Sequence, residues 1–344
     1  MDNVYAIIMA GGRGERFWPL STEEKPKPYL RLFGEKSLFQ ATVERITPFI
    51  PEERIFPVLS RQHLSKALEQ VPTLPKSNYI IEPEGKDTAA CIGLASLYLE
   101  KLDPEAITVV LPADHYISNN EEFISGLKQG IEFLKNKNRI VIIGIKPTRP
   151  ETDYGYLEIG KELGPGIFEV NKFLEKPVLA KAKEFLAREY QWNSGIFIWR
   201  NFLIQSLILR FMPELWRALS RIRESIGKQD EEDVLKMEYK KLEKVSIDYG
   251  VLEKAEDKVA VLAKFCWDDV SNWAALSRIK KEEFGNVSIG EHKAIDTQNC
   301  IVYTNGTPIT TLGLSDLVIV SANNKILVSS KERAHQIKKL LRSI

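Results

Sequence analysis

The first 145 residues alternate short, continuous apolar runs with segments whose apolar residues recur at helical spacing. The runs lie at 4–10 (VYAIIMA), 54–59, 78–81, 106–114 and 139–145. A run of this kind is typical of a strand buried on both faces of a sheet. The helical patterns fall between the runs, at 40–46, 88–102 and 121–135. This alternation predicts an α/β fold, with a parallel sheet covered by helices on both faces.

The alternation stops after residue 145. PETDYGYLEIG, FEVNKFLEKP and WNSGIFIWR indicate strands with turns, and 201–258 is rich in helix formers and charge. Within that region, RIRESIGKQDEEDVLKMEYKKLEK is interpreted as a solvated helical face. From about residue 285 short β-like runs return, with turn signals at Asn305-Gly306 and Asn323-Asn324. A basic helix is expected over 331–341.

Composition argues against several classes of protein. The 48 Lys and Arg nearly balance the 47 Asp and Glu, and a net charge of +1 gives no sign of a nucleic-acid or membrane-surface partner. The three cysteines are far apart and form no CxxC pair, which favours free thiols over a structural zinc site. No signal-peptide pattern and no membrane-length apolar run occur. We therefore expect a cytoplasmic protein without a membrane span.

A glycine-rich, basic loop, GGRGERFWPLSTEEKPKPYL, follows the first expected strand directly. A Walker loop needs Lys and then Ser or Thr after its last glycine, but here Gly14 is followed by Glu15. A dinucleotide fingerprint read from Gly12 needs a third glycine where this chain has Phe17. Ligands of such sheets bind beyond the carboxyl ends of the strands. The loop is therefore either a phosphate cradle of another kind or a glycine-rich turn with solvated charges.

Aspartates occur in two further stretches. LPAD places Asp114 at the end of an expected strand, and WDDV offers Asp268 and Asp269. Magnesium typically takes one or two carboxylates and fills its other positions with water and substrate phosphates. From the residues alone, each aspartate is equally well an exposed carboxylate at a strand exit. Nothing in the sequence proves that Asp114 and Asp269 meet.

Taken in order, these stretches resemble the sugar-1-phosphate nucleotidyltransferases. The loop resembles the family signature Gly-Gly-x-Gly-x-Arg followed by Trp-Pro-Leu-Ser and Pro-Lys. IIEPEGKDTAACIG is similar to the nucleotide-base segment, and VVLPADHYI to the strand that carries the metal aspartate. ETDYGYLE, KFLEKP and WNSGIFIW are similar to three sugar-phosphate elements, and SIDYGVLEKA and WDDVSNW complete the core. Eight pieces in the family's order make the resemblance specific.

The resemblance implies the fold and the assembly. We expect a Rossmann-like nucleotidyltransferase domain with a mixed, mainly parallel sheet over 1–285, and a small C-terminal left-handed β-helix-like domain with a terminal helix over 286–344. A homodimer is implied, because the family's β-helical tail often serves in self-association. Bifunctional relatives also carry a C-terminal isomerase domain, whereas this chain ends at Ile344, so a single activity is expected.

The resemblance is strongest to members that transfer GMP from GTP to α-D-mannose 1-phosphate, giving GDP-mannose and pyrophosphate. The attacking phosphate oxygen is already ionised near neutral pH, so positioning and charge neutralisation are the expected machinery. The lack of an obvious Ser-His-Asp or Cys-His set agrees with that chemistry. Two alternatives stay open: the same fold acting on another base or hexose 1-phosphate, and a non-catalytic subunit that senses nucleotide sugars.

The resemblance also assigns roles to the matching residues. The family's nucleotide-binding positions are filled by Gly11, Gly12, Arg13, Gly14, Glu82, Gly85, Lys86 and Asp87. Its sugar-phosphate positions are filled by Gly155, Glu175, Lys176 and Asn193, its catalytic cations by Arg16, Lys27 and Lys176, and its Mg²⁺ ligands by Asp114 and Asp269. Arg13 and Arg16 would hold the β- and γ-phosphates and Lys27 the α-phosphate. Glu82 would accept from the N1–H and N2–H₂ edge of guanine, which adenine and uracil lack.

The chain departs from the family pattern at four places. Asp87 stands where the family usually has Asn, Lys86 where it often has Arg, and Pro28 where it usually has Gln. DDVSN replaces Ser-Asp-Val-Gly-Ser. These departures bear on the selectivity for base and sugar, and Asp87 could instead be a helix cap.

Overall fold

A nine-stranded mixed sheet forms the centre of the protein. The computed structural model describes residues 3–12, 14–280 and 285–343. In space the strands are ordered β3-β2-β1-β4-β9-β6-β10-β8-β7, and β8 and β9 run against the others. Their bounds are β1 Val4–Met9, β2 Ile55–Ser60, β3 Ile80–Glu82, β4 Ile107–Pro112, β6 Ile140–Ile145, β7 Tyr156–Gly164, β8 Ile167–Leu174, β9 Gln191–Arg200 and β10 Lys258–Leu262. The predicted mixed, mainly parallel sheet is confirmed.

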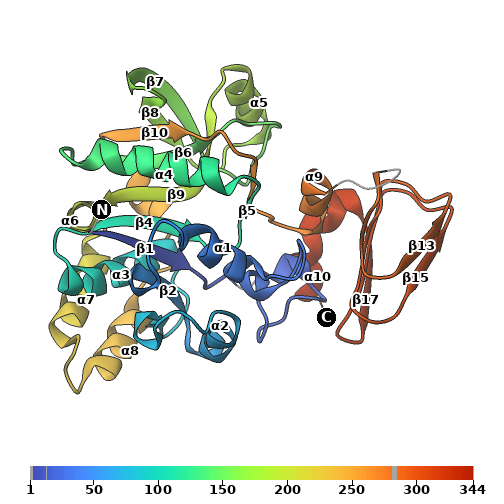
Figure 1. Ribbon diagram of the computed structural model, residues 1–344, viewed down its shortest axis with the longest axis horizontal. Coiled ribbons are helices and arrows are strands. Elements are labelled where there is room, and N and C mark those ends of the chain that lie inside the picture. Colours follow the sequence, from blue (N-terminus) through green and yellow to red (C-terminus); the bar gives the residue numbers. More distant parts are fainter. Residues whose placement is uncertain (1–2, 13, 281–284, 344) are drawn as a thin grey trace.

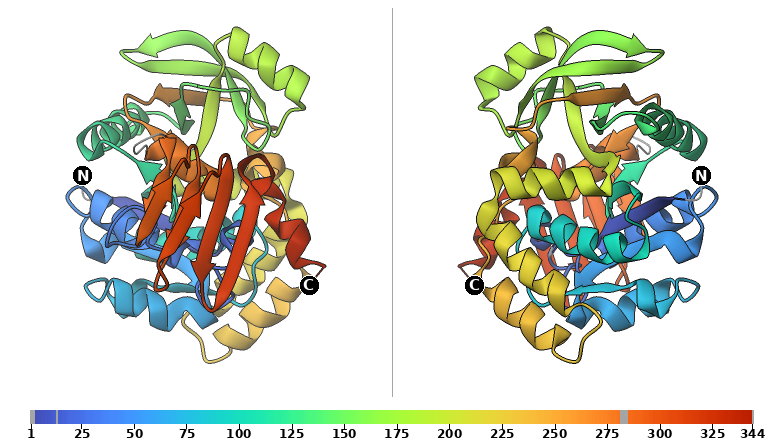
Figure 2. Two further views of the ribbon diagram at one scale, coloured as in Figure 1. Left: turned by 90° about the vertical axis from the view of Figure 1, so that its right-hand side faces the viewer. Right: turned by 90° about the vertical axis from the view of Figure 1, so that its left-hand side faces the viewer.

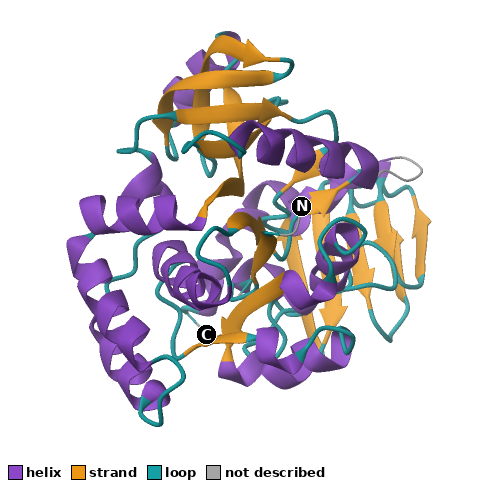
Figure 3. Cartoon of the chain, turned by 60° about the vertical axis from the view of Figure 1, so that its left-hand side comes forward, coloured by secondary structure: helices purple, strands orange, loops and turns teal. Residues whose placement is uncertain are grey.

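Helices cover both faces of this sheet (Figures 1 and 3). One face carries α1 (Leu38–Ile46), α2 (Leu64–Gln70), α4 (Asn120–Leu134) and α5 (Leu179–Ala187). The other carries α3 (Thr88–Leu102), α6 (Asn201–Phe211), α7 (Pro213–Ser225) and α8 (Glu231–Lys241). No helix within the described ranges combines the length and the apolar character that a membrane crossing needs.

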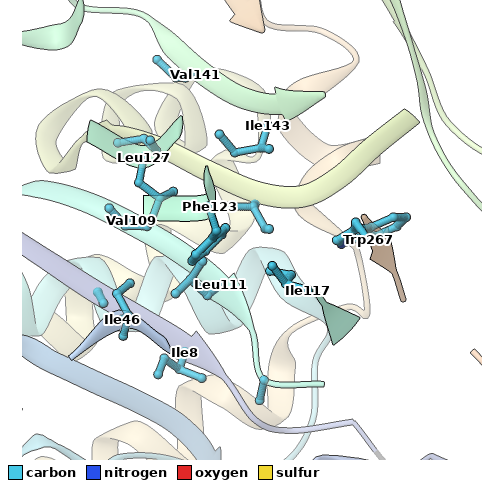
Figure 4. Packing of buried hydrophobic residues seen from close by; sticks show 14 of the residues in the cluster. Ile8, Ile46, Val109, Leu111, Ile117, Phe123, Leu127, Val141, Ile143 and Trp267 are labelled. Atoms are coloured by element: carbon cyan, nitrogen blue, oxygen red, sulfur yellow. The ribbon is translucent and has the colours of Figure 1, made fainter. Parts of the chain in front are cut away.

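Burial on both faces explains the continuous apolar runs. In β1, Ile8 packs into the cluster beneath α1 and α4, whereas its neighbour Ile7 packs into the cluster beneath α3 and α6. Figure 4 shows the first cluster, in which Leu111 of β4 lies near Phe123 of α4. Both faces of a strand therefore need apolar side chains, and no polar alternation appears in the sequence.

The prediction that the charged segment around α8 is a solvated helical face is wrong for one side of that helix. The charged segment interpreted as a solvated face buries Leu235 and Tyr239, and Glu238 is 1% exposed. Leu235 and Tyr239 lie four residues apart, so both face the same side of the helix and enter the core. Glu238 is tolerated there because Lys241 and Arg221 donate hydrogen bonds to its carboxylate. The high charge of the segment concealed this buried stripe.

The C-terminal part is a second β structure. Strands β12 (Val287–Ile289), β14 (Ile301–Thr304) and β16 (Leu317–Ala322) pair in parallel, and β17 (Lys325–Ser330) closes this sheet in antiparallel fashion. Strands β13 (His292–Ile295) and β15 (Ile309–Leu312) form a second parallel pair. The chain thus winds through two sheets in turn, which confirms the β-helix-like expectation, while its left-handedness stays a prediction. Asn323 and Asn324 turn the chain from β16 to β17 with φ of 51° and 56°.

The glycine-rich loop packs against this second structure (Figures 1 and 2). The rings of Phe17 and Trp273 pack with centroids 5.1 Å apart, and the Trp273 ring also contacts Tyr303 of β14. The Nε1–H of Trp273 donates to the backbone oxygen of Trp18 at 3.1 Å. The Nδ2 of Asn323 donates to the backbone oxygen of Pro19 at 2.8 Å. The C-terminal structure is therefore part of the support of the loop.

Replacing Trp273 with Ala should loosen this support. The side chain is completely buried between the loop and β14, so its loss leaves a cavity and should lower the free energy of unfolding by about 3–5 kcal/mol. Urea unfolding followed by circular dichroism measures the change. Leu312→Ala is the control, because Leu312 is 70% exposed and its replacement should change stability by less than about 0.5 kcal/mol. Equal effects of the two substitutions would contradict the proposed support.

Candidate functional site

Lys27 lies where three distant segments of the chain meet. Its Nζ is 2.9 Å from Oδ2 of Asp114, at the end of β4, and donates to the backbone oxygen of Asp269 at 2.5 Å. Lys27 is only 8% exposed. A buried ammonium requires such partners, because an unpaired charge away from water is costly. The structure thus brings Asp114 and Asp269 to the same ammonium, Asp114 through its carboxylate and Asp269 through its backbone oxygen.

The backbone of the loop is shaped around Lys27. The loop contains the short 3₁₀ turns η1 (Glu15–Phe17) and η2 (Lys27–Tyr29), and Gly14 precedes η1 with φ of 63°. A Cβ on Gly14 would lie only 2.7 Å from the backbone nitrogen of Lys27. Glycine is needed here both for the left-handed backbone and for the close approach. In contrast, a Cβ on Gly12 would meet nothing within 4 Å.

The two aspartates at Lys27 differ in their electrostatic setting. Burial by itself raises the pKa of Asp114, but the adjacent Lys27 ammonium outweighs it and the net shift is downward. Burial raises the pKa of Asp269, although Lys27 and the hydroxyl of Tyr154, which donates to Oδ1 at 2.5 Å, oppose that shift. Asp114 is therefore the more readily ionised of the two.

Asp268 has a separate, structural role. Arg278 donates two hydrogen bonds to its carboxylate, at 2.6 Å and 2.7 Å, and its Oδ1 accepts from the backbone N–H of Val270. The following residue, Asp269, instead faces a cavity of about 170 Å³. Of the two aspartates in WDDV, Asp269 is thus the one available to a ligand.

This cavity brings together three of the four expected sugar-phosphate residues, and Lys176 is not among its lining residues. It is lined by Gly155, Glu175, Asn193, Tyr154 and Asp269, together with residues from β1, β4 and η6 (Asp248–Leu252). Arg16 reaches its rim, where Nη1 lies 3.2 Å from Asp153, and both side chains are substantially exposed. The exposed pair places a releasable guanidinium beside the cavity.

Glu175 and Lys176 form an ion pair at the wall of the cavity. Nζ of Lys176 donates to Oε1 of Glu175 at 2.6 Å, and this partner raises the pKa of Lys176 despite the opposing effect of burial. Oε2 of Glu175 is buried without a hydrogen-bond partner among the described residues. A Cβ on Gly155 would collide with that oxygen. Gly155 therefore leaves room for Glu175 to face the cavity.

The expected base segment lies beside Gly11. A Cβ built on Gly11 would be 3.5 Å from Oε2 of Glu82, whose Oε1 accepts from the Tyr239 hydroxyl at 2.8 Å. Burial raises the pKa of Glu82 to about 7. Tyr239 was missed by the sequence analysis, and its only signal was the four-residue spacing from Leu235.

The other predicted nucleotide-binding residues near Glu82 in the sequence point in different directions. Asp87 caps α3, since its Oδ1 accepts from the N–H of Thr88 at 2.7 Å. Lys86 is directed into the protein, where its Nζ donates to the backbone oxygen of Lys240 at 3.2 Å. A Cβ on Gly85 would meet open space. Arg13 lies outside the described residues.

His115 also lines the cavity. Burial lowers the pKa of His115 to about 4, and its Nδ1 accepts from Nε1–H of Trp267 at 3.1 Å. The ring is therefore neutral at physiological pH and a weak base, with its basic nitrogen already occupied. This arrangement agrees with a site that needs no general base.

The carboxylates of Asp114 and Asp269 are suited to a divalent cation whose coordination is completed by a ligand. Within the described parts of the chain, no group of three or more His, Cys, Asp or Glu residues could hold a metal by itself. Asp114 and Asp269 provide the one or two carboxylates that Mg²⁺ takes when phosphates and water complete its coordination. The donor set therefore fits Mg²⁺ better than zinc, which prefers nitrogen and sulfur.

Comparisons with known proteins match both parts of the chain. Residues 5–284 match the family described as Nucleotidyl transferase, and residues 290–344 match the MannoseP isomerase/GMP-like beta-helix domain. A mannose-1-phosphate guanylyltransferase of Escherichia coli is 34% identical, over 98% of this chain and 75% of that protein. One of Klebsiella pneumoniae is 34% identical, over 97% and 72%. A crystal structure titled mannose-1-phosphate geranyltransferase, from Thermus thermophilus, has a TM-score of 0.90 and 38% identity, over 99% of each chain.

The close packing of Gly14 against Lys27 makes a testable prediction about stability. Gly14→Ala should lower the free energy of unfolding by about 1–3 kcal/mol, because alanine is strained at φ of 63° and clashes with the Lys27 backbone. Gly12→Ala is the matched control, since it lies in the same loop and has open space. Both are compared by urea unfolding. A Gly14→Ala protein as stable as the Gly12→Ala protein would refute the packing argument.

Proposed function

The chain belongs to the nucleotidyl transferase family, and from this premise we propose that it transfers GMP from GTP to α-D-mannose 1-phosphate, releasing pyrophosphate and GDP-mannose. The observation that carries the proposal is the contact of Lys27 with the carboxylate of Asp114 and the backbone oxygen of Asp269, beside a cavity that Glu175 and Asp269 line. A buried cation with acidic residues next to a polar cavity suits a triphosphate and a sugar phosphate. The names of the relatives over nearly the whole chain support the choice of guanine and mannose.

In the proposed reaction a phosphate oxygen of mannose 1-phosphate attacks the α-phosphorus of GTP. A new P–O bond forms, the bond between the α-phosphorus and the bridging oxygen breaks, and its electron pair leaves with pyrophosphate. The Lys27 ammonium, which already contacts the Asp114 carboxylate and the Asp269 backbone oxygen, would also bind the α-phosphate. Arg16 would leave its ion pair with Asp153 and bind the β- and γ-phosphates instead. Positioning and charge neutralisation then lower the barrier without proton transfer.

We also propose that Mg²⁺ is the cofactor and that Asp114 and Asp269 hold it. When bound, Mg²⁺ would neutralise the negative charge on the phosphates. The lowered pKa of Asp114 keeps this carboxylate ionised and ready for a cation. Tyr154 orients Asp269 through its hydroxyl, and Arg278 keeps the neighbouring Asp268 away from the cation.

A pyrophosphate-release assay tests the proposal. Four nucleoside triphosphates are crossed with several hexose 1-phosphates, each with and without Mg²⁺. We expect the highest kcat/KM for GTP with mannose 1-phosphate, and loss of turnover without the metal. Preference for another pair would favour the alternative substrate assignment. Absence of turnover with every pair would contradict the enzyme proposal and favour a nucleotide-sugar-sensing subunit.

Selectivity for guanine should depend on pH through Glu82. The carboxylate accepts from guanine only when ionised, and with a pKa of about 7 it becomes protonated as pH falls. The ratio of kcat/KM for GTP to that for ATP should therefore fall about tenfold from pH 8 to pH 6. Because the triphosphate groups of GTP and ATP titrate alike, their titration cancels in this ratio.

Glu82→Gln provides the control for this pH effect. Its side chain does not titrate, so its GTP-to-ATP ratio should be low and the same at both pH values. A wild-type ratio that does not change with pH, or a variant that follows the wild-type profile, would remove Glu82 from the recognition of the base.

A further inference from the structure

Asp248 is a second carboxylate in the sugar cavity, beyond the residues to which the family pattern gives a role. It opens η6, a π-helical turn, and lines the same cavity of about 170 Å³ as Glu175 and Asn193. Turns of this kind are rare and frequently occur at functional sites. The turn that begins with Asp248 is therefore a candidate functional element of the cavity wall.

The carboxylate of Asp248 is held in place by Asn193. The Oδ1 of Asn193 accepts from the backbone N–H of Gly195 at 3.0 Å, and this bond sets which end of the amide is the oxygen. The Nδ2 must then face Asp248, and it donates to Oδ1 of Asp248 at 2.8 Å. Asn193 thus orients the carboxylate on the cavity wall.

One wall of the cavity holds a buried acceptor without a donor in the part of the chain that the structure describes. Glu175 has a side chain only 5% exposed, and its Oε2 lacks a partner among the described residues. Burial and the nearby Glu175 raise the pKa of Asp248 to about 7. Lys176 is the facing cation and opposes that shift, while Glu253 accepts from the backbone N–H of Glu175. Unsatisfied buried acceptors are costly, so a ligand that donates hydrogen bonds would stabilise the site.

We propose that Asp248 is a specificity-determining residue, which accepts a hydrogen bond from one hydroxyl of the sugar 1-phosphate while Glu175 accepts from another. This inference rests on the proposed function. This acidic wall disfavours a phosphate group, whereas the hydroxyls of a pyranose ring supply the missing donor for Glu175 and a donor for Asp248. Asn193 is then a positioning residue, because it acts through Asp248.

Asp248→Asn tests the inference, because the substitution preserves size and removes the charge. Steady-state kinetics with saturating GTP compare mannose 1-phosphate with its 2-, 3-, 4- and 6-deoxy analogues. With mannose 1-phosphate we expect the KM of the variant to rise about 10- to 100-fold, with a smaller change in kcat. For the one analogue that lacks the recognised hydroxyl, wild type and variant should have nearly equal kcat/KM.

Two controls separate recognition from structure. Glu256→Gln makes the same change of charge at an exposed position after η6 and should leave the kinetics unchanged. Circular dichroism and urea unfolding check that Asp248→Asn is folded, and Asp248→Ala serves as a second variant. An unchanged KM, or the same loss with all four deoxy analogues, would overturn the inference.

The outcome also distinguishes failure of the inference from failure of the proposed function. If wild type turns over mannose 1-phosphate and Asp248→Asn shows no dependence on any hydroxyl, only the inference fails. If wild type does not use mannose 1-phosphate, the proposed function fails, and calorimetry repeats the comparison with the hexose 1-phosphate that it binds. A wild type that binds no hexose 1-phosphate overturns both.

Discussion

The requirement to neutralise the buried ammonium of Lys27 holds the site together. Removing one partner of a buried ion pair typically costs about 3–5 kcal/mol, so the loop, the end of β4 and the segment after β11 (Trp267–Asp268) are bound to one another by that charge. The residues around Lys27 maintain this arrangement. Gly14 gives Lys27 its close approach, and Tyr154 orients Asp269.

The second constraint comes from the C-terminal β structure. Tyr303 of β14 packs against Trp273, which in turn packs against Phe17 of the loop, and Asn323 binds the loop backbone at Pro19. The loop contains no regular helix or strand of its own beyond short turns in its described part, so these contacts limit its conformations. The C-terminal structure thereby contributes to the geometry of a site whose described cavity lining includes none of its side chains.

The parts of the fold that could be predicted are those that a short sequence pattern specifies. Strands buried on both faces need apolar runs, and β1 and β4 follow directly from theirs. The order of the motifs pointed to Lys27, Asp114 and Asp269. That the three meet depends on how distant elements dock, and no local pattern encodes it.

Three residues show what the sequence alone could not predict. Tyr239 lies in a highly charged helix, and its contact with Glu82 joins positions far apart in the chain. Asp248 has no local signature, because its role depends on Asn193 and Glu175, which lie on the same cavity wall. Asp87 was ambiguous in the sequence, and the structure places it at the start of α3 as a cap.

The central claim is that Lys27, Asp114 and Asp269 form the reacting centre. A crystal structure with Mn²⁺ in place of Mg²⁺ and with bound GDP-mannose tests it most directly, because anomalous scattering locates the metal. We predict one Mn²⁺ coordinated by both Asp114 and Asp269, with the Lys27 ammonium within hydrogen-bond distance of the α-phosphate. A metal bound elsewhere, or a Lys27 that contacts no phosphate, would contradict the account.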